Sequence, residues 1–321
     1  MTQVAGGIGM SHAPGLTGWP DAPPADVRER IAASVSAIRD YLLAANPDVI
    51  VAFLDDHFDN LSRNTMPPIA LGVADRNYGP PEYYFGMLRM ERTLEVPSSR
   101  AFAESLLRQL VAENFDIARL GATDYCQNLM VPLHLVWPEN QFPVVPLYIN
   151  VFSPPLISPA RAFELGRTIR RIVEERPERV LFLATGGLSH WPPFWNENSP
   201  EDDEFLQRMK RFQTEGRHVL QEDRELFDDF GRYEIEMAAK SDHLLVSEDW
   251  DRRFLQAFAD GDTDYMTAMT VEKIAEEAGP GGNEVLNWIA LMGAMNGAPA
   301  TVLSYDVSPE WITGVAFTLY R

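Results

Sequence analysis

Three of the six histidines in the sequence stand in the same local context, just beyond a short apolar segment. His12 follows "VAGGIGM", His57 follows "VIVAFL" and His190 follows "RVLFLATGGL". A single histidine in such a place most often hydrogen-bonds a backbone carbonyl at the edge of the core. Three together favour a shared site. Because an imidazole can bind a metal or exchange a proton near neutral pH, the chemistry expected is metal binding, acid/base catalysis or both.

A metal site built on histidines needs a carboxylate as well. Two histidines and one carboxylate on one face, with the other positions open, form the usual site for non-haem Fe(II) that binds an organic substrate and dioxygen. Glu284 lies in "GPGGNEVLNWIALMGAM", in the first turn of an apolar helix, where the helix dipole favours an acid even without a metal. Asp55 and Asp56, beside His57, are competing candidates.

The segments that must position these residues alternate between strand and helix patterns. An apolar segment at 4–10 is followed by apolar residues at helical spacing from Val27 to Leu42, and then by the continuous apolar run 49–54. This order predicts a β-α-β unit. The pattern recurs in predicted helices at 98–115 and 158–175 and in predicted strands at 117–120, 143–151 and 179–184.

The expected fold is therefore α/β, a three-layer sandwich around a mostly parallel central sheet. In such sheets the loops beyond the carboxyl ends of neighbouring strands converge on one crevice. The three histidines meet there if their strands are neighbours.

The C-terminal third has a different pattern. Residues 200–279 are charged and helical, which predicts a helical insertion, and the segments 300–305 and 312–321 are predicted to return to the sheet. Residues 60–98, rich in Pro, Tyr and Asn, are predicted to form a long loop over one end of the sheet. Without a repeat or a Ser/Gly linker, residues 1–321 are expected to form a single domain.

Composition limits the classes of partner. The net charge of −20, from 47 acids and 27 bases, argues against a nucleic acid or an anionic membrane as partner, because both require a basic face. The single cysteine, Cys126, excludes an internal disulfide and a cysteine-rich zinc site, and it suits a reducing compartment. The sequence has no signal-like N-terminus and no apolar run of membrane-spanning length, so a cytoplasmic protein is expected.

Four segments, in the order in which they occur, resemble the signature blocks of the class III extradiol ring-cleaving dioxygenases: "GMSHAP", "FLDDHFDNLSRNTMPPIALGV", "VLFLATGGLSHWPP" and "GGNEVLNWIA". These enzymes act on protocatechuate, gallate and 2,3-dihydroxyphenylpropionate. The resemblance implies that His12, His57 and Glu284 bind Fe(II), and that His190 is the acid/base beside the metal. It also implies a small catecholic substrate that is opened with both atoms of O2. By the same analogy a homo-oligomer is expected, and some related enzymes need a small accessory subunit.

The sequence departs from the family pattern in "DYCQNLMVPLHLVWP". Many members have a second active-site histidine there, and counting back from Pro132 and Leu133 places Gln127 at its position. Glutamine can donate a hydrogen bond but cannot carry a proton at neutral pH. An altered ring, such as an aminophenol, a hydroxypyridine or a more heavily hydroxylated aromatic, is the hypothesis that follows. His134 is expected to be a packing residue rather than a replacement.

Two other functions are compatible with the same residues. Zinc also accepts two histidines and a glutamate with an open water position, which would suit a hydrolase that needs no dioxygen. A non-catalytic binding protein on the same scaffold is the third possibility, with Gln127 as a sign of lost activity. Against it stand the intact ligand set and His190. His218 is expected on a solvated helix, and His243 is expected to be structural.

Overall fold

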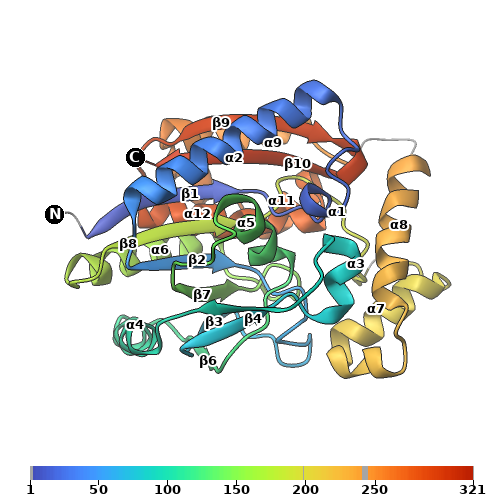
Figure 1. Ribbon diagram of the computed structural model, residues 1–321, viewed down its shortest axis with the longest axis horizontal. Helices are drawn as coiled ribbons and strands as arrows, with labels where there is room; N and C mark the ends of the chain where they lie inside the picture. The colour runs from blue at the N-terminus through green and yellow to red at the C-terminus, as the bar shows by residue number, and fades with distance from the viewer. Residues whose placement is uncertain (1–2, 198, 241–244, 321) are drawn as a thin grey trace.

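The computed structural model describes residues 3–197, 199–240 and 245–320, and it is organised around a mixed eight-stranded sheet (Figure 1). The strand order is β6-β3-β7-β2-β8-β1-β10-β9. The four central strands, β7, β2, β8 and β1, run parallel, whereas β3 and β10 run antiparallel to their central neighbours. The predicted mostly parallel central sheet is therefore confirmed. The strands are β1 (Val4–Met10), β2 (Val49–Leu54), β3 (Ile69–Gly72), β6 (Ala118–Leu120), β7 (Val144–Ile149), β8 (Val180–Thr185), β9 (Thr301–Ser308) and β10 (Thr313–Tyr320).

Helices cover both faces of the sheet, because the side chains of its strands alternate between two hydrophobic cores. In β2, Val49, Val51 and Phe53 belong to one core, and the residues between them belong to the other. The first core lies under α4 (Arg100–Ala112), α6 (Pro159–Glu174), α9 (Glu248–Asp260) and α12 (Val285–Ala294). The second lies under α2 (Ala25–Ala45) and α5 (Gln127–Val136). The expected three-layer sandwich is confirmed.

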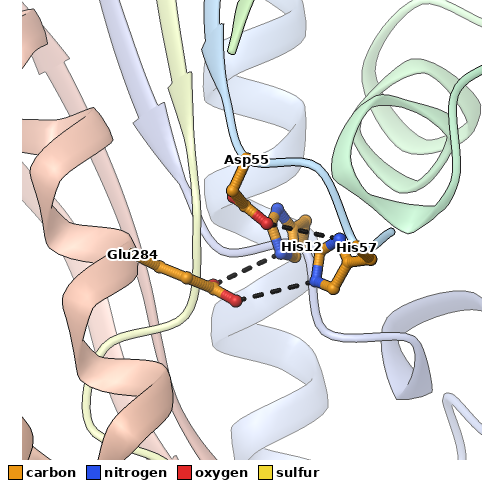
Figure 2. A group of neighbouring side chains, drawn as sticks. All are labelled: His12, Asp55, His57 and Glu284. Carbon is orange, nitrogen blue, oxygen red and sulfur yellow. Dashed lines mark ion pairs between the residues drawn. The ribbon is translucent and has the colours of Figure 1, made fainter. Parts of the chain in front are cut away.

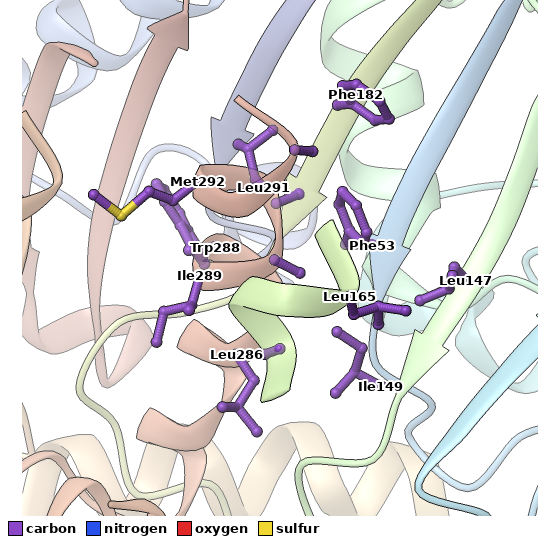
Figure 3. Close-up of a cluster of buried hydrophobic side chains, with 14 of the residues drawn as sticks. Phe53, Leu147, Ile149, Leu165, Phe182, Leu286, Trp288, Ile289, Leu291 and Met292 are labelled. Carbon is purple, nitrogen blue, oxygen red and sulfur yellow. The ribbon is translucent and has the colours of Figure 1, made fainter. Parts of the chain in front are cut away.

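The contact between α6 and α12 fixes the helix that follows Glu284. Leu165 and Trp288 are buried in the core formed by these helices and the sheet (Figure 3). Gly166 allows the close approach, because a Cβ at that position would clash with the carbonyl of Ala290. This packing holds the start of α12 at the carboxyl end of the sheet.

The region from 200 to 279 is helical, as predicted, and its described residues form no strand. It comprises α7 (Glu204–Glu215), η2 (Arg217–Gln221), α8 (Leu226–Lys240), α9, α10 (Thr263–Ala268) and α11 (Val271–Ala278). Helices α7 and α8 stand beyond the carboxyl ends of the central strands, at the right of Figure 1. β9 and β10 then return to the sheet. Within the described part of the chain, no helix is long and apolar enough to cross a membrane.

The prediction of a long loop over 60–98 is wrong. This segment contains β3 of the main sheet, the pair β4 (Arg76–Gly79) and β5 (Leu94–Pro97), and the short helices η1 (Glu82–Tyr84) and α3 (Phe85–Leu88). β3 is only four residues long and pairs with β7 and β6, which come much later in the chain. Such pairing depends on partners that local sequence patterns do not contain.

Candidate active site

The three strands that precede the histidines are neighbours in the sheet and end at the same level. Met10 of β1 pairs with Thr185 of β8, and Phe53 of β2 pairs with Ala184. His12, His57 and His190 lie just beyond these ends, so their side chains enter the same space.

Glu284 reaches this space from η3 (Pro280–Glu284), the turn that leads into α12. Its Oε2 lies 3.3 Å from Nε2 of His12. Its Oε1 lies 3.7 Å from Nε2 of His57 and 3.4 Å from Nε2 of His190. The structure thus brings together the three histidines and the glutamate that the sequence singled out.

A buried cluster that could hold a metal ion consists of His12, Asp55, His57 and Glu284, shown in Figure 2. One ligand atom from each of the four lies within 4.8 Å of the others. Asp56 is not in this group, because its carboxylate accepts hydrogen bonds from the backbone N–H groups of Asn60 and Leu61, at 3.2 and 2.9 Å. It therefore holds the loop that follows His57.

A chain of hydrogen bonds orients the ring of His12. The Thr185 hydroxyl lies 2.7 Å from the carbonyl of Asn128, to which it donates its only hydrogen. Its oxygen must therefore accept from Nδ1 of His12, 3.1 Å away. With the hydrogen on Nδ1, the Nε2 atom that faces Glu284 is free to use its lone pair.

The ring of His57 is held by a hydrogen bond between its Nδ1 and the thiol of Cys126, with Asp55 beside it. Nδ1 of His57 lies 3.2 Å from Oδ2 of Asp55 and 3.3 Å from Sγ of Cys126. The side-chain amide of Asn287 donates to Oδ1 of Asp55 at 2.9 Å, whereas Oδ2 has no hydrogen-bond donor among the described residues and is available to a metal ion. Burial and the nearby Glu284 raise the pKa of Asp55 to about 6, and burial raises the pKa of Cys126 to about 12. The thiol is thus in its neutral form.

His190 is held by its own loop. Its Nδ1 donates to the carbonyl of Leu188 at 2.8 Å, which leaves Nε2 facing the cavity. The preceding residue, Ser189, donates from its backbone N–H and its hydroxyl to Asp251, at 2.8 and 2.9 Å. Burial alone would lower the pKa of His190. The Glu284 carboxylate and the Leu188 carbonyl outweigh this effect, so the pKa of His190 lies above its ordinary value.

The donor set fits a divalent cation. Burial would raise the pKa of Glu284, yet His12 and His190 hold it well below its usual range, so the carboxylate is ionised. The backbone N–H of Gly187 donates to the same carboxylate. Two imidazole nitrogens with their Nδ1 atoms engaged and one ionised carboxylate are the ligands that Fe(II) and Zn(II) accept.

A cavity with about 470 Å³ of empty space, part of it open to solvent, lies against these residues. Gln127 is buried in its wall, and the Oε1 atom of this glutamine has no hydrogen-bond partner among the described residues. The remaining lining residues are mostly apolar or aromatic, and include Pro192, Pro193, Phe194, Phe230, Trp311 and Ile312. A cavity of this composition suits an aromatic ring.

The other histidines lie outside the cavity or outside the described residues. His134 is exposed on α5, so the expectation that it packs is wrong, and it lines a different hollow with Arg89 and Met90. The reason is that the apolar side of this helix is carried by its neighbours, Leu133 and Val136, which are buried. His218 is exposed, as expected. His243 falls in the segment 241–244, outside the described residues.

Sequence reasoning missed three polar residues of the site. Asn287 had a usable signal, because it follows Glu284 at a helical spacing that places both on one face. Thr185 is the last residue of its strand, and nothing local distinguishes it. Glu234 lines the cavity from α8, far from every motif in the sequence.

Comparison with known proteins identifies a family for the chain. A family model described as "Catalytic LigB subunit of aromatic ring-opening dioxygenase" matches residues 6–317. The chain belongs to this family. The LigB family is the class III extradiol family that the four sequence blocks resembled, so that recognition is confirmed.

Similar curated relatives cover nearly the whole chain. A "2,3-dihydroxyphenylpropionate/2,3-dihydroxicinnamic acid 1,2-dioxygenase" of Cupriavidus pinatubonensis is 30% identical over 96% of this chain and 95% of its own. A protein of the same name from Paraburkholderia xenovorans is 31% identical over 94% and 93%. A third, from Dechloromonas aromatica, is 29% identical over 95% and 94%. As a LigB protein, the chain is an aromatic ring-opening dioxygenase with a buried candidate metal site.

Proposed function

We propose that the protein is an Fe(II)-dependent extradiol dioxygenase that opens a catecholic or closely related ring and inserts both atoms of O2. In this proposal His12, His57 and Glu284 bind the metal. The observation that supports it is the convergence of two Nε2 atoms on an ionised carboxylate, with Nδ1 of His12 hydrogen-bonded to Thr185 and Nδ1 of His57 to Cys126. Fe(II) bound there would offer open positions to the ring oxygens and to O2 and would supply electron transfer between them.

His190 is the proposed acid/base. Because its Nδ1 donates to Leu188, its Nε2 can accept the proton of a substrate hydroxyl and return it when the ring opens. It is absent from the four-residue metal cluster, although its Nε2 lies 3.4 Å from Glu284. Its position beside the proposed ligands, in the lining of the cavity, supports this role.

Gln127 contributes a hydrogen bond rather than a proton. Its unpartnered Oε1 lies in the wall of the cavity, where a hydroxyl or amino group of the substrate can donate to it. The proton that leaves the substrate must then go to His190. A ring with an amino group beside its hydroxyl would also satisfy Gln127.

The test is metal-dependent oxygen uptake. Protein stripped of metal with a chelator and reloaded anaerobically with Fe(II) should consume one O2 per ring opened from a panel of catechols, gallates and aminophenols. Protein loaded with Zn(II) should consume none. Hydrolysis by the zinc form without oxygen uptake would instead support a hydrolase.

Variants separate the proposed roles. His12→Ala and Glu284→Ala should lose both iron and activity, whereas His190→Ala should retain iron and lose roughly 10²–10⁴-fold in turnover. His218→Ala changes an exposed histidine and serves as the matched control. Loss of iron from His190→Ala would contradict the assignment. A homo-oligomer, with or without a small accessory subunit, stays a prediction that the molar mass in solution checks.

A further inference from the structure

One acidic side chain of the cavity is not used by the proposed chemistry. Glu234 lies on α8, four residues after Phe230, so both occupy the same face of the helix and line the cavity. Its side chain belongs to the helical region rather than to the sheet that supplies the metal cluster. Only 4% of Glu234 is exposed.

Glu234 has no hydrogen-bond donor or ion-pair partner among the described residues, unlike other buried acids near the site. Asp59 accepts from the hydroxyls of Tyr83 and Tyr84, and Asp251 accepts from Ser189. Burial raises the pKa of Glu234 to about 8, and His190 acts in the opposite direction. Because a buried carboxyl without a donor is unfavourable, a ligand that supplies a donor would be stabilised here.

Lysine and arginine, the side chains that most often pair with a substrate carboxylate, are missing from the described lining of the cavity, and its basic side chains are three histidines, the two of the metal cluster and the proposed acid/base. The other acid of the lining is Glu284. Aromatic and apolar side chains, including Phe194, Phe230 and Trp311, line the same cavity as the two acids. Because Glu234 also interacts electrostatically with His190, a ring held beside His190 has the carboxyl group of Glu234 near its substituent.

We propose that Glu234 selects the substituent of the aromatic substrate. The cavity takes a ring whose side chain ends in a neutral or positively charged hydrogen-bond donor, such as an ammonium, amine or hydroxyl group. It rejects a ring whose side chain ends in a carboxylate. This proposal rests on the proposed function, because it assumes that the ring is held at the metal cluster.

The selectivity follows from charge and hydrogen bonding. An ammonium or hydroxyl group donates directly to the carboxylate of Glu234, which removes the cost of leaving that group without a donor. A substrate carboxylate would meet a like charge at Glu234 when that group is ionised, and would otherwise have to share the proton that the raised pKa of Glu234 retains near neutral pH, with no lysine or arginine in the described lining to neutralise the pair. The relatives are named for 2,3-dihydroxyphenylpropionate, a ring with a carboxylate side chain. The proposal therefore assigns this chain a different substrate charge.

The test measures binding in the absence of oxygen. Calorimetry on the Fe(II)-loaded protein would give dissociation constants for dopamine, ethylcatechol and dihydroxyphenylpropionate, which carry ammonium, neutral and carboxylate side chains. Dopamine should bind at least about tenfold more tightly than dihydroxyphenylpropionate. In Glu234→Gln this ratio should approach one. Glu225→Gln, which changes an exposed glutamate just before α8, should keep the wild-type ratio.

Each contrary result overturns the proposal. The proposal is overturned if the wild-type protein binds dihydroxyphenylpropionate as tightly as dopamine or more tightly. It is also overturned if none of the three rings binds. A folded Glu234→Gln protein with the wild-type ratio of dissociation constants overturns it as well. If Glu234→Gln instead loses turnover equally with all three rings, Glu234 acts in proton transfer and the proposal is wrong. Oxygen uptake with ethylcatechol tests the dioxygenase function separately, because this ring makes no demand on Glu234.

Discussion

Replacement of Gly281 by alanine should displace the proposed acid/base without touching the metal ligands. Gly281 lies in η3, directly against the ring of His190. A Cβ at this position would come within 2.5 Å of the Cδ2 and Cε1 atoms of that ring, and closer still to Nε2. Non-bonded carbon atoms require about 3.5 Å, so the imidazole must move by about 1 Å.

The magnitude follows from that displacement. Misplacing a catalytic group by about 1 Å costs on the order of 10²-fold in rate, so kcat of Gly281→Ala should fall by about that factor. Iron content should stay at the wild-type level, because His190 is not one of the proposed ligands. Gly121→Ala is the matched control, since its added Cβ would have nothing within 4 Å. Oxygen uptake at saturating catechol and iron analysis of the same samples give both quantities.

Two results would refute this reasoning. An unchanged kcat in a folded Gly281→Ala protein would mean that the position of Nε2 in His190 does not limit turnover. Loss of iron would mean that His190 is a ligand, or that the turn carries Glu284 away with it. Either outcome would require a different assignment of acid and ligand.

Four further predictions follow from individual contacts. Asn287→Leu should lower the free energy of unfolding by about 3 kcal/mol in urea titrations, because it leaves the Asp55 carboxylate and a backbone carbonyl without their donor. Its iron affinity should fall about 10- to 100-fold. Fe(II) should raise the Tm of the stripped wild-type protein but not that of His12→Ala. Since the pKa of Glu234 is raised to about 8 in the folded protein, the stability it contributes is lost as pH rises from about 4.5 to about 8. The free energy of unfolding of Glu234→Gln should therefore rise relative to that of the wild type between pH of about 4.5 and pH of about 8, as measured by urea titration at both values. Gln127→His should change the preference between catechols and aminophenols in oxygen uptake, and an unchanged preference would dismiss a role for Gln127 in recognising the ring.

The central sheet could be predicted because its signals are local. Continuous apolar runs such as 49–54 mark strands buried on both faces, and the helical spacing from Val27 to Leu42 marks α2. The placement of His12 and His57 follows from these strands, because side chains beyond the carboxyl ends of adjacent parallel strands meet. No comparable local rule describes β3, whose four residues are a strand only because β7 and β6 lie beside them.

The rest of the site depends on contacts between distant segments. Thr185 matters because it connects His12 to Asn128, residues that are far apart in the sequence. Glu234 matters because α8 folds back over the strand ends, which no pattern within residues 226–240 reveals. The sequence also could not decide which of Glu284, Asp55 and Asp56 supplies a carboxylate to the metal cluster, because that depends on contacts between distant segments. Asp56 is excluded from the cluster by the loop that it holds.

The lining of the cavity includes two parts of the fold, the strand ends with the turn before α12 and the helix α8. This division affects how such enzymes can diversify. The metal cluster is built from strand ends and the turn before α12, where a substitution disturbs a sheet shared by the whole molecule. Phe230 and Glu234 belong to α8, which stands outside that sheet (Figure 1). If Glu234 selects the substituent as proposed, mutations confined to this helix would change which aromatic ring such an enzyme accepts. The oxygen chemistry would be inherited intact.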